Sequence, residues 1–304
     1  MSELAGLVVC PDCRSSFAWS ARSISCESCA AEFPLVDGVP VLVPKAVEGT
    51  ELKRKQAEYF DRELDREYEI TRPHATPPLY RWLLEEKFRR SIAGVESTLR
   101  DATALAVCAG SGMDAEFLAR MGADVIAADI SLGAARRTAE RARRYGLPVT
   151  PIVADVERLP FADASIDVVY VHDGLHHLER PDLGLAEMAR VAGRAVCVSE
   201  PARATITRIA VRLGLALEHE ESGNRVARLT LDGISDVLSA QGFRPARAER
   251  YAMYYRHEPG PAMRLLSMPA LLPLAKGGFR FANCIAGRFG NKLAVQAVRV
   301  GALS

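Results

Sequence analysis

The run at 105–114, Leu-Ala-Val-Cys-Ala-Gly-Ser-Gly-Met-Asp, constrains the fold of this chain more than any other feature. Its apolar first residues are typical of a buried strand, and the residues from Asp114 onward are typical of a helix. Gly110 and Gly112 between them permit a tight turn and a close approach of a ligand to the N–H groups at the start of the helix. A strand, a glycine loop and a helix in this order predict the nucleotide-binding corner of a doubly wound α/β sheet.

Apolar strands and helices alternate over the residues that follow. Strands are predicted at 104–108, 123–128, 149–153, 166–171 and 195–199, and helices at 114–121, 132–145 and 181–190. This alternation is typical of parallel strands joined by helical crossovers. A helix at 231–240 then precedes two further strands, at 247–255 and 293–300. The sequence therefore predicts an α/β fold with a doubly wound, seven-stranded mixed sheet of the Rossmann-like kind.

The composition is that of an ordinary globular protein. Of its 304 residues, 49% are hydrophobic and 25% are charged, and the net charge is +1. A nearly neutral chain argues against a protein devoted wholly to nucleic acid. We find no signal-peptide pattern at the N-terminus and no apolar stretch of the roughly 18 residues needed to span a bilayer. We therefore expect a cytoplasmic protein whose thiols stay reduced.

Four cysteines near the N-terminus form two C-x2-C pairs, Cys10 with Cys13 and Cys26 with Cys29, separated by 12 residues. Two such pairs supply four thiolates for a tetrahedral zinc ion. Disulfides or redox dithiols are the alternative, which a reducing compartment disfavours. Because the protein supplies all four ligands, we expect a structural zinc ion that holds together a small domain at 1–45.

Acidic residues follow the glycine loop at the ends of later strands. Asp129 ends the second strand, 17 positions after Gly112, where an acidic side chain accepts hydrogen bonds from ribose hydroxyls. The third strand runs into Ala-Asp-Val-Glu-Arg-Leu-Pro-Phe at 154–161, and the fourth into Val-His-Asp-Gly-Leu-His-His at 171–177. With these motifs in register, residues 104–201 resemble class I S-adenosylmethionine-dependent methyltransferases, most closely the small-molecule subset that includes quinone-biosynthesis enzymes. The N-terminal domain resembles the zinc ribbons that precede some methyltransferases.

The resemblance implies a site for S-adenosylmethionine. The implied cofactor-binding residues are Ala109, Gly110, Gly112, Asp114, Asp129, Ile130, Asp155, Val156 and His172. Among them, Asp155 would accept from the adenine amino group. Members of the family usually have an acidic residue and a further glycine where this chain has Ala106 and Cys108. We expect Asp114 or Glu116 to supply the missing carboxylate beside the cofactor's ammonium group.

Two histidines after the fourth strand are candidate catalytic residues. We predict His176 as the general base and His172 as a pocket residue near the cofactor, because histidine suits proton transfer at neutral pH. The alternative is that the histidines cap the next helix, and Glu200 at the end of the fifth strand is a weaker candidate for acceptor contact. The predicted reaction methylates a small or lipid-linked acceptor, with oxygen favoured. An RNA base methyltransferase that grips RNA with its ribbon, and a non-catalytic partner protein with a degenerate cofactor site, are the alternatives.

The other residues complete the domain plan. Residues 46–100 are expected to form a helical linker or lid, and residues 101–304 the methyltransferase domain. The linker's helices are predicted at 51–69 and 79–93. Insertions on the acceptor side are predicted at 202–229, as an amphipathic helix, and at 257–290. The second insertion is apolar with flanking basic residues, so it could cover an apolar acceptor, contact a membrane surface or pack on the sheet. The sequence leaves the oligomeric state open.

Overall fold

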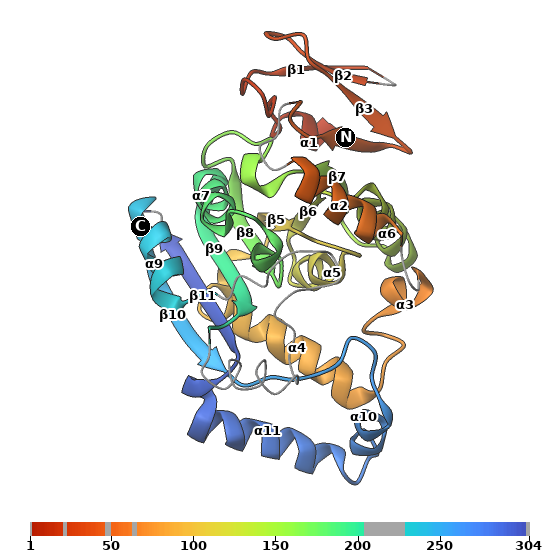
Figure 1. Ribbon diagram of the computed structural model, residues 1–304, viewed down its shortest axis with the longest axis vertical. Helices are drawn as coiled ribbons and strands as arrows, with labels where there is room; N and C mark the ends of the chain where they lie inside the picture. Colours follow the sequence, from red (N-terminus) through yellow and green to blue (C-terminus); the bar gives the residue numbers. More distant parts are fainter. Residues whose placement is uncertain (1, 21–22, 46–49, 63–65, 204–228, 302–304) are drawn as a thin grey trace.

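The computed structural model describes residues 2–20, 23–45, 50–62, 66–203 and 229–301. A sheet runs through the molecule with helices packed on both of its faces (Figure 1). Its parallel strands are β5 (Thr103–Val107), β6 (Asp124–Asp129), β7 (Val149–Ala154), β8 (Ile166–His172) and β9 (Ala192–Pro201). β11 (Lys292–Arg299) lies antiparallel between β9 and β10 (Phe243–Tyr251). The order β7-β6-β5-β8-β9-β11-β10 confirms the doubly wound mixed sheet.

The central strands are buried on both faces because their apolar residues continue without a break. Leu105 belongs to a hydrophobic cluster with residues of α7 (Pro181–Val191) and α9 (Leu231–Ala240). Its neighbour Ala106 points to the opposite face, where α4 (Pro78–Ile92) and α5 (Met113–Arg120) pack. α6 (Leu132–Tyr145) contacts the outer strands β6 and β7. The position at which the family usually has a carboxylate is therefore filled by core packing.

The predicted helices and strands between 103 and 201 are confirmed, with ends that shift by a few residues. The strand predicted at 247–255 is wrong in its bounds, because β10 ends at Tyr251. Beyond it, the side-chain amides of Asn283 and Asn291 hydrogen-bond the backbone of Ala252 and Met253. These bonds replace strand pairing, and the chain leaves the sheet to line the cavity described below.

The N-terminal domain continues the central sheet. It contains α1 (Ser2–Ala5) and the strands β1 (Phe17–Trp19), β2 (Ser23–Cys26), β3 (Glu32–Val36) and β4 (Val39–Leu42). β4 pairs in parallel with β7, so the described residues form a sheet of 11 strands and the predicted count of seven is wrong. This pairing satisfies backbone groups along the open edge of β7. Phe33 and Leu42 share one hydrophobic cluster with Ile152 and Phe161, which joins the ribbon to the main domain.

Several helices lie outside the sheet's own crossovers. The residues predicted as one helix at 51–69 form α2 (Thr50–Asp61) and α3 (Arg66–Thr71), with 63–65 outside the described residues. The amphipathic helix predicted at 202–229 falls almost wholly outside them. Residues 257–290 lie between β10 and β11 and form α10 (Pro261–Leu266) and α11 (Leu272–Ala286). Within the part that the structure describes, no helix combines the length and apolar content needed to cross a bilayer.

Candidate active site

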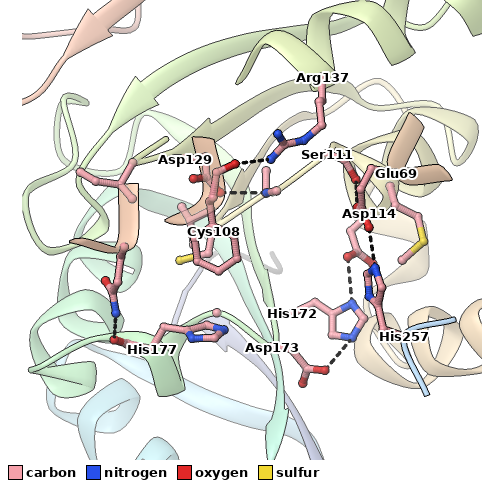
Figure 2. Close-up of a pocket in the computed structure, with 18 of the residues that line it drawn as sticks. Glu69, Cys108, Ser111, Asp114, Asp129, Arg137, His172, Asp173, His177 and His257 are labelled. Atoms are coloured by element: carbon pink, nitrogen blue, oxygen red, sulfur yellow. Dashed lines mark hydrogen bonds and ion pairs between the residues drawn. The ribbon is translucent and has the colours of Figure 1, made fainter. Parts of the chain in front are cut away.

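A cavity of about 1190 Å³ lies at the carboxyl edge of the parallel strands, where sheets of this type bind their ligands. Its lining comes from the ends of β5, β6, β7 and β8, from α2 and α3, and from the residues that follow β10. Figure 2 shows these side chains gathered from several elements around one space. Of the predicted cofactor-binding residues, all but Gly112 line it. The cavity is large enough for a nucleoside cofactor together with a second ligand.

The glycine loop after β5 makes the turn that the sequence predicts. Gly110 and Gly112 have φ of 53° and 77°, values that side chains rarely adopt. A β-carbon on Gly112 would lie 2.8 Å from the Thr138 side chain, so this glycine packs the loop against α6. Cys108, where the family usually has glycine, has a φ of 50°. The absence of a side chain at Gly174 leaves room for Cys108, because a β-carbon at Gly174 would lie 2.4 Å from the β-carbon of Cys108.

Asp129 ends β6 beside the glycine loop. Its carboxylate accepts the N–H of Gly110 at 2.8 Å and the N–H of Ser131 at 2.9 Å. Burial raises the pKa of Asp129, and the two N–H groups act in the opposite direction. The carboxylate therefore holds the loop in place and retains lone pairs for the hydroxyl groups of a ligand. This position fits the predicted ribose site.

The position of Asp155 is shared with a lysine that the sequence analysis missed. Lys53 of α2 donates to Asp155 and to Glu157, each at 2.6 Å, and Asp155 also accepts the N–H of Glu157 at 3.0 Å. Gln56, on the same face of α2, donates to the backbone carbonyl of His177 at 2.6 Å. Lys53 and Gln56 are three residues apart, a helical spacing that would have indicated this face. α2 thus covers the end of the cavity that holds Asp129 and Asp155.

A carboxylate and a guanidinium from the region of α3 face the glycine loop. Glu69 accepts the Ser111 hydroxyl at 2.9 Å and lies 2.7 Å from Nε2 of His257 (Figure 2). Burial opposes ionisation of Glu69, but the hydrogen bond to His257 and the charge of Arg72 outweigh it and lower its pKa to about 2. Arg72 lies 3.0 Å from Nδ1 of His257, and its buried Nε has no hydrogen-bond partner among the described residues. The sequence analysis missed both residues.

Asp114 lies in the first turn of α5 and lines the same end of the cavity. Its carboxylate is 2.8 Å from Nδ1 of His172 and accepts the Tyr170 hydroxyl at 3.3 Å. Burial alone would raise the pKa of Asp114, but the neighbouring His172 and more distant cations lower it overall. The expectation that Glu116 could serve here is wrong, because its buried carboxylate pairs with Arg141 at 2.8 Å away from the cavity.

His172 lies between two carboxylates. Its Nδ1 faces Asp114, and its Nε2 lies 3.6 Å from Asp173 (Figure 2). Asp173 pairs in turn with the buried Lys87 and, at 2.8 Å, with Lys292. Burial opposes ionisation of Asp173, but the two lysines outweigh it and hold its pKa well below the usual range. A carboxylate on Nδ1 fixes the tautomer and the orientation of the ring, which suits His172 to accept a proton at Nε2.

The structure does not support His176 as the base. Its side chain is 5% exposed and lies outside the cavity lining, with Nδ1 2.7 Å from the buried Glu200. Glu200 also accepts the N–H groups of Gly174 and Leu175, at 2.8 and 2.7 Å. The pair therefore fixes the turn after β8 and does not face a ligand. The neighbouring His177 does line the cavity.

The four N-terminal cysteines form one cluster, as the sequence predicts. Their sulfur atoms all lie within 4.8 Å of one another, with 3.7 Å between Cys10 and Cys29 and 3.4 Å between Cys13 and Cys26. A disulfide would need a sulfur separation of about 2.05 Å. Zinc–sulfur bonds of about 2.3 Å in a tetrahedron place sulfur atoms just under 4 Å apart, so the cluster fits zinc. Arg158, beside the Asp155 turn, donates to the carbonyls of Pro11 and Asp12 in the first knuckle.

The fold and the comparisons with known proteins define the same class. Residues 105–195 match the family described as "Methyltransferase domain". A magnesium protoporphyrin IX methyltransferase from Synechocystis PCC 6803, solved with bound S-adenosylhomocysteine, aligns with a TM-score of 0.56 and 18% identity over 83% of this chain and all of its own. An identity this low shows the fold alone. The chain therefore contains a class I methyltransferase domain with the Rossmann-like fold.

Curated relatives share more of the sequence over a shorter span. The demethylmenaquinone methyltransferase of Thermobifida fusca is 37% identical over 110 residues, which are 35% of this chain and 46% of that protein. The demethylmenaquinone methyltransferase of Renibacterium salmoninarum is 32% identical over 154 residues, 48% of this chain and 63% of that protein. The chain thus spans about half the length of these relatives.

Proposed function

We propose that this protein transfers a methyl group from S-adenosylmethionine to a small or lipid-linked acceptor of the quinone type. The observation that carries the proposal is the meeting of the glycine loop, Asp129 and Asp155 in one cavity of a methyltransferase domain. The names of the curated relatives support a quinone-type acceptor. The solved neighbour that holds S-adenosylhomocysteine in the same fold supports the cofactor.

The proposed cofactor position follows the charges in the cavity. Adenosine lies against Asp129, Ile130 and Asp155, as the resemblance implies. The amino-acid end of the cofactor carries an ammonium and a carboxylate, and it points toward Glu69 and Arg72, which offer one charge of each sign. We assign the ammonium to Glu69 rather than to Asp114, because Glu69 hydrogen-bonds the glycine loop through Ser111, whereas Asp114 orients His172 in the proposed reaction.

In the proposed reaction S-adenosylmethionine supplies a methyl group on a sulfonium. A lone pair of the acceptor forms the new bond to the methyl carbon while the carbon–sulfur bond breaks, and its electron pair stays on sulfur. The acceptor's hydroxyl proton passes to Nε2 of His172, whose ring Asp114 orients through Nδ1 at 2.8 Å. Removal of the hydroxyl proton makes both the oxygen and the adjacent ring carbon nucleophilic, and we propose transfer to oxygen. α2 and α3 act as a lid that excludes water from the cavity.

Turnover of a hydroquinone tests this proposal. We would incubate the full chain with S-adenosylmethionine carrying a labelled methyl group and with 1,4-dihydroxynaphthalene, and locate the label by NMR. His172→Asn should lower kcat by roughly 100-fold or more, the usual contribution of a general base, while His176→Asn keeps kcat within a few-fold. Equal turnover by His172→Asn and wild type would remove His172 from the mechanism.

The same preparation separates the alternative functions. Calorimetry with S-adenosylmethionine should give one binding site, and a chain without detectable binding would instead be a non-catalytic partner protein. Label incorporated into an RNA transcript but not into the hydroquinone would favour the RNA base methyltransferase. Label on a ring carbon would keep the acceptor class and overturn the assignment to oxygen.

A further inference from the structure

The insertion between β10 and β11 exposes an unusual number of large apolar side chains. Seven of them lie exposed between 265 and 289: Leu265, Leu266, Met268, Leu274, Phe281, Ile285 and Phe289. Figure 1 shows α11 along one end of the molecule, with no other helix or strand of the described residues beyond it. Scattered exposed apolar residues are ordinary, but seven within one insertion indicate a contact surface.

α11 is apolar on two opposite faces. Its inner face packs on α4, where the rings of Phe279 and Trp82 meet edge to face at 5.3 Å. Its outer face carries Leu274, Phe281 and Ile285, which are 72%, 68% and 62% exposed. Spacings of seven and four residues place these three on one side of the helix. An apolar helix face is normally buried against a partner, so the outer face of α11 calls for a second one.

The charge of the insertion indicates what that partner is. Between 259 and 291 the chain contains no aspartate or glutamate. Its charged residues are Arg264, Lys276, Arg280 and Arg288. Lys276 and Arg280 lie over the Trp82 ring, at 5.5 and 5.6 Å, on the border between the packed and the open face. Apolar side chains flanked only by cations complement a surface that has an apolar interior and negative headgroups.

We infer that α10 and α11 dock this protein onto the surface of an anionic lipid bilayer. The apolar side chains enter the boundary between headgroups and acyl chains, and the flanking cations pair with lipid phosphates. The docking face also adjoins the cavity. Tyr254, which is 79% exposed, belongs to the cavity-lining segment just before α10, and Met263 of α10 packs against the same hydrophobic cluster as Tyr255. Delivery of a lipid-linked acceptor by this route rests on the proposed function, whereas docking itself does not.

Sedimentation with vesicles tests the inference. The full chain should sediment with vesicles of equal parts phosphatidylglycerol and phosphatidylcholine at least tenfold more strongly than with phosphatidylcholine alone. Binding should fall at least tenfold in the double variant Phe281→Ser, Ile285→Ser, and several-fold in Arg264→Glu, Arg288→Glu. Met121→Ser removes an exposed apolar residue at the end of α5 and should bind as wild type. Absence of wild-type binding, or equal binding to both kinds of vesicle, would overturn the inference.

Two further measurements keep the result unambiguous. Light scattering on the wild type should give a particle of one chain's mass, 33.1 kDa; a dimer that Phe281→Ser dissociates would assign the face to a second copy and overturn the inference. S-adenosylhomocysteine should bind the Phe281→Ser, Ile285→Ser variant with unchanged affinity, which shows that the variant is folded. Vesicle binding needs no cofactor, so its result does not depend on whether the protein transfers methyl groups.

Discussion

The two ends of the cavity are built from different parts of the chain. At the end proposed for adenosine, Asp129 ends β6 and Asp155 directly follows β7, and both are where the sequence places them. At the other end, β5 directs Ala106 into the core, and the charged groups Glu69 and Arg72 come from the region of α3. Residues at the end of a strand can therefore be predicted from the strand, whereas a side chain delivered by a covering helix cannot.

This contrast also shows how a family pattern can change without loss of the site. Cys108 stands at a glycine position, and Gly174 on the neighbouring strand's loop leaves the space that it needs. In our proposal, Glu69, which accepts the Ser111 hydroxyl of the glycine loop, takes the place of the carboxylate absent from β5.

The largest expected effect lies at the adenosine end. Asp129→Asn removes the charge that accepts two N–H groups and, in our proposal, the ribose hydroxyls. At about 1.5 kcal/mol for each charge-assisted bond, affinity should fall about 100-fold for S-adenosylhomocysteine and equally for 5′-methylthioadenosine, which lacks the amino-acid end. Calorimetry measures both, with Asp124→Asn at the exposed start of β6 as the control. A loss seen with only one of the ligands would contradict the assignment.

Zinc removal should act on the same end through Arg158. A chelator is expected to unfold the ribbon and release the Asp155 turn that Arg158 ties to the knuckle. Both adenosine ligands should then bind about tenfold more weakly, the equivalent of one to two lost hydrogen bonds. Arg158→Ala should give part of this loss, whereas Arg14→Ala, which removes ribbon contacts to Asp163 and Glu187, should give none. Unchanged affinity in the metal-free protein would separate the ribbon from the site.

Acid titration probes the other end with a smaller effect. The pKa of Glu69 is lowered in the folded protein to about 2, from an ordinary value near 4.5. Its ionisation therefore stabilises the fold above pH 4.5, and this contribution is lost as the pH falls toward 2. Between pH 6 and pH 3.5, the wild type should lose about 1 kcal/mol more unfolding free energy than Glu69→Gln. Urea unfolding at the two pH values measures this difference, and parallel curves would show that Glu69 is not held ionised.

The sequence predicted the doubly wound sheet, the glycine loop, the four-cysteine cluster and the positions of Asp129 and Asp155, because each depends on local patterns or on strand ends. It did not predict that β4 would extend the sheet, since edge pairing depends on which free edge a separate domain meets. It favoured His176 as the base, because the sequence does not show that His172 lines the cavity whereas His176 packs outside it against Glu200. Lys53, Glu69 and Arg72 were missed because their distance to the loop exists only after folding.

The central claim is that Glu69 replaces the carboxylate that β5 lacks. Calorimetry of wild type and Glu69→Gln with S-adenosylhomocysteine and with 5′-methylthioadenosine tests it most directly, with Glu67→Gln on the same helix as the control. We expect Glu69→Gln to lower the affinity for S-adenosylhomocysteine about tenfold, as for one charged hydrogen bond. The affinity for 5′-methylthioadenosine should stay unchanged. An equal loss of affinity for both ligands, or no loss for either, would contradict the claim.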